Sequence, residues 1–170
     1  MVDAAVHEGL NPIAAVRKAL DAVVDPEIPV LSIADIGILR DVRLSADGAI
    51  EVLITPTYSG CPAMNAIAFD IEVALVRAGI ANHRIITRPS PAWTTDWISP
   101  EAREKLRAYG IAPPTTPSGS KRALFAVDMV ACPRCGSHKT ERVSEFGSTS
   151  CKALYRCTAC REPFDYFKCI

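Results

Sequence analysis

The chain lacks both a long apolar segment and an excess of either charge. No apolar run approaches the roughly 20 residues that a helix needs to span a bilayer, and the N-terminus carries acids where a secretory signal would carry bases. The 19 basic and 19 acidic residues give a formal net charge of zero. We therefore expect a cytoplasmic protein with no membrane contact. Nucleic-acid binding is disfavoured, because it needs a basic surface.

Several catalytic motifs are absent as well. The sequence has no Ser-His-Asp triad, no glycine-rich phosphate loop, no G-x-G-x-x-G motif and no ExxH di-metal pattern. Its three histidines, His7, His83 and His138, are scattered and predict no histidine metal site. We therefore expect no catalytic activity from the chain by itself.

Cysteine, in contrast, is plentiful: there are seven, and four of them form two CxxC pairs. Two residues between the cysteines of a pair let both sulfurs face one ion, and four thiolates close the coordination shell of Zn²⁺. The odd count, the paired spacing and the lack of an export signal favour reduced thiols over disulfides. We predict a structural zinc ribbon, with iron in a rubredoxin-like site as the alternative. The predicted ligands are Cys132, Cys135, Cys157 and Cys160.

The residues beside the two pairs differ. Gly136 follows the first pair and gives the backbone freedom that a tight metal knuckle often needs, whereas Arg161 stands at the matching place after the second pair. This asymmetry weakens the iron alternative. Cys151 and Cys169 fall outside the pairs. Each fits a packed thiol, a replacement ligand or half of a second redox or metal site, and the sequence does not choose.

Hydrophobic periodicity predicts an α+β domain before the ribbon, with the element order α-β-β-α-β-α. A turn at residues 46–48 joins the first two strands into a hairpin, Gly79 ends the second helix, and Ser99 caps the third. The predicted elements are a helix over 12–24, strands over 36–44 and 49–55, a helix over 64–78, a strand over 83–88 and a helix over 100–109.

Composition divides the chain into two domains. Residues 113–120 are rich in proline, threonine, serine and glycine and have too little apolar surface to pack. We predict an α+β domain over 1–112, a linker over 113–127 and a β-rich zinc ribbon over 128–170, closed by a strand over 164–167. The ribbon's own core is small, so the metal should supply most of its folding free energy.

Cys61 is the candidate for a reactive or metal-binding thiol outside the ribbon. Pro62 suits the first helical position, which would place Cys61 at the helix N-cap, where unpaired amide groups favour a thiolate. Thr57 and its neighbours in the preceding loop offer hydroxyls and amides that could line a shallow pocket. A buried cysteine that acts as a small hydrophobe fits the same sequence.

Five further side chains are candidates. Asp25, Glu27 and Asp35 could supply oxygen ligands for iron or form a polar rim, although each fits a turn or capping role at least as well. Trp93 and Trp97 lie in a predicted loop, which suits a partner surface, while one of them capping the core is the alternative.

Taken together, these segments resemble known protein families. The first two thirds of the chain is similar to the α+β domain of SufT-like iron-sulfur assembly factors, on three motifs: 25–30 (Asp-Pro-Glu-Ile-Pro-Val), 35–37 (Asp-Ile-Gly) and 57–62 (Thr-Tyr-Ser-Gly-Cys-Pro). Nearly the whole chain resembles the PaaD (or PaaJ) family of bacterial phenylacetate catabolism. The added segments are 93–98, 109–114, the Cys-Pro-Arg-Cys-Gly of the first pair, and 162–169.

This resemblance implies an accessory or maturation subunit of the multicomponent oxygenase that converts phenylacetyl-CoA to its ring-1,2-epoxide. The implied partners are the oxygenase subunits, their reductase and iron-sulfur assembly proteins. Cys61 would be the residue that handles iron or a cluster transiently, with Asp25, Glu27, Asp35 and Thr57 as neighbouring motif residues, and the ribbon cysteines would hold zinc. Two other roles are open: a permanent structural or electron-transferring subunit, and a nucleic-acid-binding ribbon.

Overall fold

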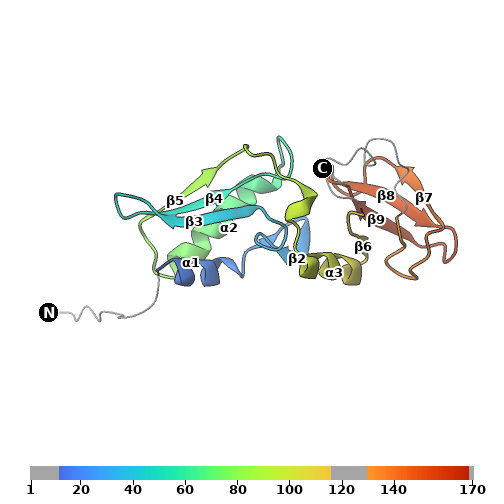
Figure 1. Ribbon diagram of the computed structural model, residues 1–170, viewed down its shortest axis with the longest axis horizontal. Coiled ribbons are helices and arrows are strands. Elements are labelled where there is room, and N and C mark those ends of the chain that lie inside the picture. Colours follow the sequence, from blue (N-terminus) through green and yellow to red (C-terminus); the bar gives the residue numbers. More distant parts are fainter. Residues whose placement is uncertain (1–11, 116–129, 169–170) are drawn as a thin grey trace.

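A computed structural model describes residues 12–115 and 130–168 of the chain. Figure 1 shows the two larger sheets side by side, with α3 between them. The α+β fold and the β-rich C-terminal region predicted from the sequence are confirmed. The elements are α1 (Pro12–Leu20), β1 (Val24–Asp25), β2 (Ile28–Ser32), β3 (Leu39–Leu44), β4 (Ile50–Ile54), α2 (Ala63–Arg77), β5 (His83–Thr87), a 3-10 turn (Thr95–Trp97), α3 (Pro100–Tyr109), β6 (Ile111–Ala112), β7 (Thr140–Ser144), β8 (Lys152–Cys157) and β9 (Pro163–Phe167).

The N-terminal sheet has the strand order β3-β4-β5, antiparallel between β3 and β4 and parallel between β4 and β5. Ile50, Val52 and Ile54 alternate along β4 and are all buried, as the period-2 pattern predicted. Helices α1 and α2 cover the face of the sheet on which these side chains lie (Figure 1).

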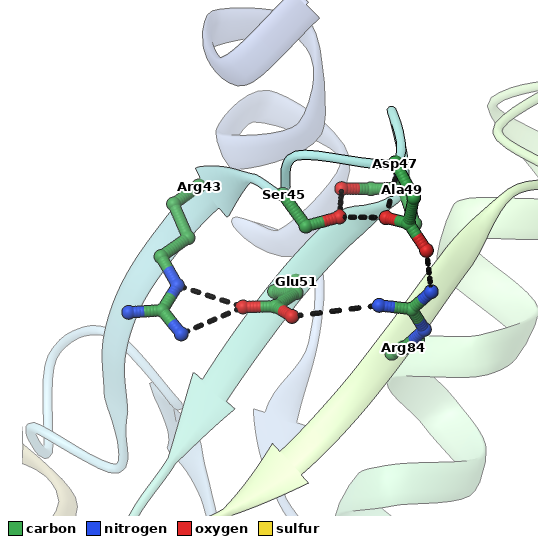
Figure 2. Close-up of polar contacts among 6 residues, drawn as sticks. All are labelled: Arg43, Ser45, Asp47, Ala49, Glu51 and Arg84. Atoms are coloured by element: carbon green, nitrogen blue, oxygen red, sulfur yellow. Dashed lines mark hydrogen bonds and ion pairs between the residues drawn. The ribbon is translucent and has the colours of Figure 1, made fainter.

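The other face of this sheet carries a row of charges. Figure 2 shows Glu51 of β4 between Arg43 of β3 and Arg84 of β5, with the α1 ribbon behind the sheet. Arg43 Nε donates to Glu51 at 2.7 Å, and Arg84 NH1 lies 3.6 Å from the other carboxylate oxygen of Glu51. Arg84 also pairs with Asp47 in the hairpin turn. These cross-strand pairs hold the three strands in register on a face that none of the described helices covers.

The largest difference from the predicted elements lies between α1 and β3. Helix α1 ends at Leu20 instead of continuing to residue 24, because the next residues form a second hairpin, β1-β2, which the sequence did not reveal. The carbonyl of Val23 accepts from the amide of Ile33 at 3.0 Å and so extends this pairing. Strand β3 then begins at Leu39, three residues later than predicted, because residues 33–37 form turns.

The helix ends were predicted more accurately. Gly79 has φ +76° just beyond α2, and Gly110 is left-handed at the C-cap of α3. Ser99 caps α3, accepting from the amide of Ala102 at 3.0 Å. The N-cap of α2, however, is Pro62, so Cys61 lies one residue outside the position predicted for it.

The C-terminal sheet has the order β6-β9-β8-β7. Its strand β6 comes from the segment directly after α3 and pairs in parallel with β9. Tyr155 and Tyr166 pack edge to face in its small core, with ring centroids 5.4 Å apart. Phe167 and Cys151, in contrast, belong to the core of the N-terminal domain, where the Phe167 ring lies 6.0 Å from that of Trp93. The two parts of the molecule are therefore joined by a strand and by buried side chains.

The domain boundaries placed at residues 112 and 127 stay a prediction, since residues 116–129 lie outside the described ranges. Cys169 also lies outside these ranges. None of the helices in the described part of the chain combines the length and the apolarity that crossing a membrane requires.

Candidate metal and thiol sites

The four cysteines of the CxxC pairs converge on one point. Their sulfurs all lie within 4.8 Å of one another, with 3.7 Å between Cys132 and Cys160 and 3.6 Å between Cys135 and Cys157. A tetrahedron of sulfurs about 2.3 Å from a central Zn²⁺ has edges of about 3.8 Å. The donor set and spacing therefore fit one tetrahedral metal ion, which these sulfurs would enclose without an open position.

The backbone of each pair forms a tight knuckle. In the first, Gly136 donates to the carbonyl of Cys132 at 2.9 Å with φ +73°. In the second, Arg161 occupies the matching position with φ +66°, and it is the one non-glycine residue with positive φ in the described ranges. The second knuckle thus keeps the same backbone shape, although Arg161 adopts it at a steric cost.

Hydrogen bonding prepares one of these sulfurs for metal. The amide of Cys160 donates to the sulfur of Cys157 and, against some burial, lowers the pKa of Cys157 to about 7. The amide of Glu162 lowers the pKa of Cys160, but burial and the other three sulfurs outweigh it and raise that pKa to about 12, so metal binding has to release a proton from this pair.

Cys61 lies at the entrance of α2 and is half-buried. Its amide donates to the carbonyl of Tyr58 at 3.2 Å, and its own carbonyl accepts from Met64 at 3.4 Å. The structure thus places its thiol between an irregular loop and the first turn of a helix, partly open to solvent.

Tyr58 connects this loop to the ribbon. Its hydroxyl hydrogen-bonds the side chain of Ser150, two residues before β8 begins at Lys152. Burial raises the pKa of Tyr58, and the acidic groups of Cys61, Glu27 and Cys151 raise it further. Groups from three segments of the chain therefore act electrostatically on Tyr58.

The Asp25-Pro26-Glu27 motif forms the β1-β2 turn. The Oδ1 atom of buried Asp25 accepts from the amides of Glu27 at 2.8 Å and Ile28 at 2.9 Å, so this carboxylate shapes the turn. Burial raises the pKa of Asp25. Burial and then the neighbouring Asp25 raise the pKa of Glu27.

Lys152 supplies the positive charge of this region. Its side chain is only 4 % exposed, its Nζ atom lies 3.8 Å from Asp165, and it attracts Asp25 and Glu27. A buried lysine among carboxylates is uncommon, and this one faces the same groups as Cys151.

Asp35 lies elsewhere. It accepts from the Ser32 amide at 3.0 Å and from the Lys105 ammonium at 2.6 Å, beside an open cleft of about 310 Å³ that Asp21 also lines. Burial opposes ionisation, but the hydrogen bonds from Lys105 and Ser32 outweigh it and lower the pKa of Asp35. The contacts of Asp35 are those of a turn residue paired with α3, and none of them involves the group around Cys61.

The remaining predicted residues divide between core and surface. Thr57 is buried at 6 % exposure. Placing Trp93 on a partner surface was wrong: it is 4 % exposed, and its Nε1 donates to the carbonyl of Ile36 at 2.9 Å inside the core. Trp97 is half-buried beneath the guanidinium of Arg40, 3.4 Å from the ring centroid.

Sequence reasoning placed Tyr58 in the loop before Cys61 but did not join Cys151 and Lys152 to this region. The one available signal was that Cys151 stands outside the CxxC spacing. Nothing in the local sequence indicated which domain it would face.

Comparison with protein families gives two matches along the chain. An iron-sulfur cluster assembly protein family matches residues 13–81, and the PaaD zinc beta ribbon domain matches residues 116–168. The first range includes Cys61, Asp25 and Glu27, and the second includes all four clustered cysteines.

Individual relatives agree with these matches. The chain is 50% identical over 151 residues to a protein of Escherichia coli K12 named as a subunit of 1,2-phenylacetyl-CoA epoxidase, covering 89% of each chain. It is 34% identical over 90 residues, 52% of this chain and 85% of the relative, to an "Fe-S protein maturation auxiliary factor" of Porphyromonas gingivalis. Among solved structures, a domain of unknown function (DUF59) from Bacillus anthracis is 25% identical with a TM-score of 0.50, covering 55% of this chain and 90% of that one.

Proposed function

The chain belongs to the PaaD family, and from this premise we propose that it assists the assembly or repair of iron centres in the phenylacetyl-CoA epoxidase. The E. coli relative is named as a subunit of that epoxidase, and the P. gingivalis relative as a factor in Fe-S protein maturation. The two names together support an accessory role in which the ring oxygenase or its reductase is the client. General iron-sulfur assembly proteins would be further partners.

One observation gives the proposal its main support: the thiol of Cys61 lies apart from the four clustered thiols of the ribbon. The four ribbon sulfurs enclose their own metal position, which suits a structural Zn²⁺ ion. Cys61 stays outside that cluster, half-exposed at a helix entrance, and lies within the segment that matches iron-sulfur assembly proteins. Iron passing through the protein would therefore be cargo at Cys61, with Glu27 as a neighbouring oxygen donor.

The test is complementation of a strain that lacks the gene. We expect Cys61→Ser to restore neither ring epoxidation nor iron loading of the purified oxygenase, while its own zinc content and thermal unfolding match those of the unmodified protein. Ser59→Ala, an exposed change in the same loop, is the matched control and should restore both. Full oxygenase activity with Cys61→Ser would overturn the proposal.

The word "subunit" in the name of the E. coli relative favours a second candidate, a permanent structural or electron-transferring component of the oxygenase. This role predicts that the chain copurifies with active epoxidase at fixed stoichiometry. A maturation factor, in contrast, would be dispensable once the oxygenase carries its iron. The activity of iron-loaded oxygenase, measured in vitro with the chain removed and again after the chain is added back, distinguishes the two roles.

A further inference from the structure

Helix α2 is apolar on both of its sides. Ile67, Ile71 and Leu75 are buried in the core, whereas Phe69 and Val76 lie on the side that faces solvent and are 67 % and 58 % exposed. Single exposed apolar side chains are common, but these two are seven residues apart and therefore share one stripe of the helix surface. A stripe of this kind is typical of a helix that another helix covers.

The stripe has a centre and a charged border. Val73 is half-buried and lies on the side of the helix opposite the core, with Phe69 and Val76 in a column on one side of it. Asp70 and Arg77 are exposed and form the column on the other side. No ion pair joins either charge to another residue in the described part of the chain. These five residues are called the outer face of α2 below.

The outer face of α2 is complementary to a second copy of itself in antiparallel orientation. A two-fold axis that crosses the helices at Val73 keeps each column in place and reverses its direction. Phe69 of one copy then faces Val76 of the other, and Asp70 faces Arg77. The symmetry makes each of these contacts twice, and the two copies of Val73 meet at the centre.

A parallel pair of the same helices does not have this complementarity. A two-fold axis along the helices exchanges the two columns, so that Phe69 would face Asp70 and Val76 would face Arg77. Each contact would then set a charge against an apolar side chain and leave it without an opposite charge. The two charges therefore favour the antiparallel pair, and they act mainly on its specificity, since exposed ion pairs contribute little free energy.

We propose that the protein forms a two-fold symmetric dimer through the outer face of α2. Cys61 precedes Val73 by 12 residues, which corresponds to about 18 Å along the helix. The two copies of Cys61 therefore lie at opposite ends of the helix pair, and neither is covered by it. Each copy presents its own thiol, and the dimer does not bring the two thiols together.

Sedimentation velocity of the full zinc-loaded chain over a range of concentrations tests the dimer. A single pair of helices buries less area than a permanent dimer needs, so we expect reversible association that increases with concentration. Phe69→Ser should weaken the association at least about tenfold, because it removes an aromatic contact that occurs twice. Leu44→Ser is the matched control, since Leu44 is 56 % exposed on β3, and this variant should associate as the unmodified chain does.

Exchange of the two charges tests the orientation of the helices. Asp70→Arg alone sets two guanidinium groups against each other, and Arg77→Asp alone sets two carboxylates against each other, so each should weaken the dimer. The double variant restores opposite charges in the antiparallel pair and should recover most of the association. Circular dichroism checks that each variant keeps its helix content.

Three results would overturn the proposal. They are a chain that stays monomeric at every concentration, a dimer that Phe69→Ser does not weaken, and a double charge variant that associates no better than the single ones. None of these results bears on Cys61, whose role is decided by complementation.

Discussion

Gly37 illustrates how a motif residue can be structural. Its φ is +77°, and a Cβ atom there would lie 2.7 Å from the Cβ of Trp97. Gly48 in the hairpin turn has a similar φ of +81° but nothing within 4 Å of a Cβ position. A side chain at Gly48 would therefore meet backbone strain alone, whereas a side chain at Gly37 would meet both backbone strain and crowding.

We predict that Gly37→Ala lowers the free energy of unfolding by about 3 kcal/mol, combining left-handed strain with overpacking. Gly48→Ala should cost only the strain, about 1 kcal/mol. Urea denaturation of both variants measures the difference. Equal losses would show that the contact with Trp97 relaxes freely.

At this scale the sequence predicted what depends on local spacing. The four ribbon ligands followed from the CxxC pattern alone. The orientation of Trp93 did not, because its partners, Ile36 and Phe167, are distant in the sequence. The separation of Asp35 from Cys61 depends likewise on Lys105, a residue of α3 that no local pattern connects to it.

At the scale of secondary-structure elements, the side chain of His83 connects β5 to α2 and to the turn that follows α2. Its ring nitrogens face two acceptors at 2.7 Å each, the Ile80 carbonyl through Nδ1 and the Glu72 carboxylate through Nε2. A doubly protonated ring donates to both. Burial lowers the pKa of His83, but these two acceptors outweigh it and raise the pKa above 6.5.

The sign of the pH effect follows from this raised pKa. The stabilisation by His83 is complete below pH 6.5 and is lost as the pH rises through the pKa of the folded state. We predict that the difference in unfolding free energy between the unmodified protein and His83→Gln shrinks from pH 6 to pH 8. Urea denaturation at several pH values tests this, and a difference that grows with pH would contradict it.

Elements with strong periodicity were predictable, and short ones were not. Helix α2 and the β3-β4 hairpin carry regular apolar patterns with clear turn residues. Strands β1 and β6 have two residues each, too few to show any period. Strand β1 pairs with the neighbouring β2, whereas β6 depends on β9, a distant partner in the sequence. The α+β class was therefore accessible from sequence, while β1-β2 and the pairing of β6 with β9 were not.

At the scale of the whole molecule, the ribbon's metal should stabilise both domains. Phe167 of β9 packs in the N-terminal core against Trp93, so disorder of the ribbon would expose that core. We predict that chelation of the ribbon metal lowers the thermal midpoint of the N-terminal domain and shifts Trp93 fluorescence toward that of exposed indole.

A Trp97→Phe background isolates the Trp93 signal. Phe167→Ala, which removes the contact, should reduce the response of Trp93 to chelation while costing about 3 kcal/mol by itself. A Trp93 spectrum unchanged after complete metal loss would show that the two domains unfold independently.

Strand β6 also limits how this ribbon can be recombined with other proteins. Ile111 and Ala112 follow α3 directly, yet they complete the sheet that β9, β8 and β7 form. A chimera that transplants only the segment after residue 115 would leave one edge of β9 bare, and the donor domain would keep an orphaned strand. Successful grafts of this ribbon onto new hosts should therefore carry α3 with them, or supply an equivalent edge from the host.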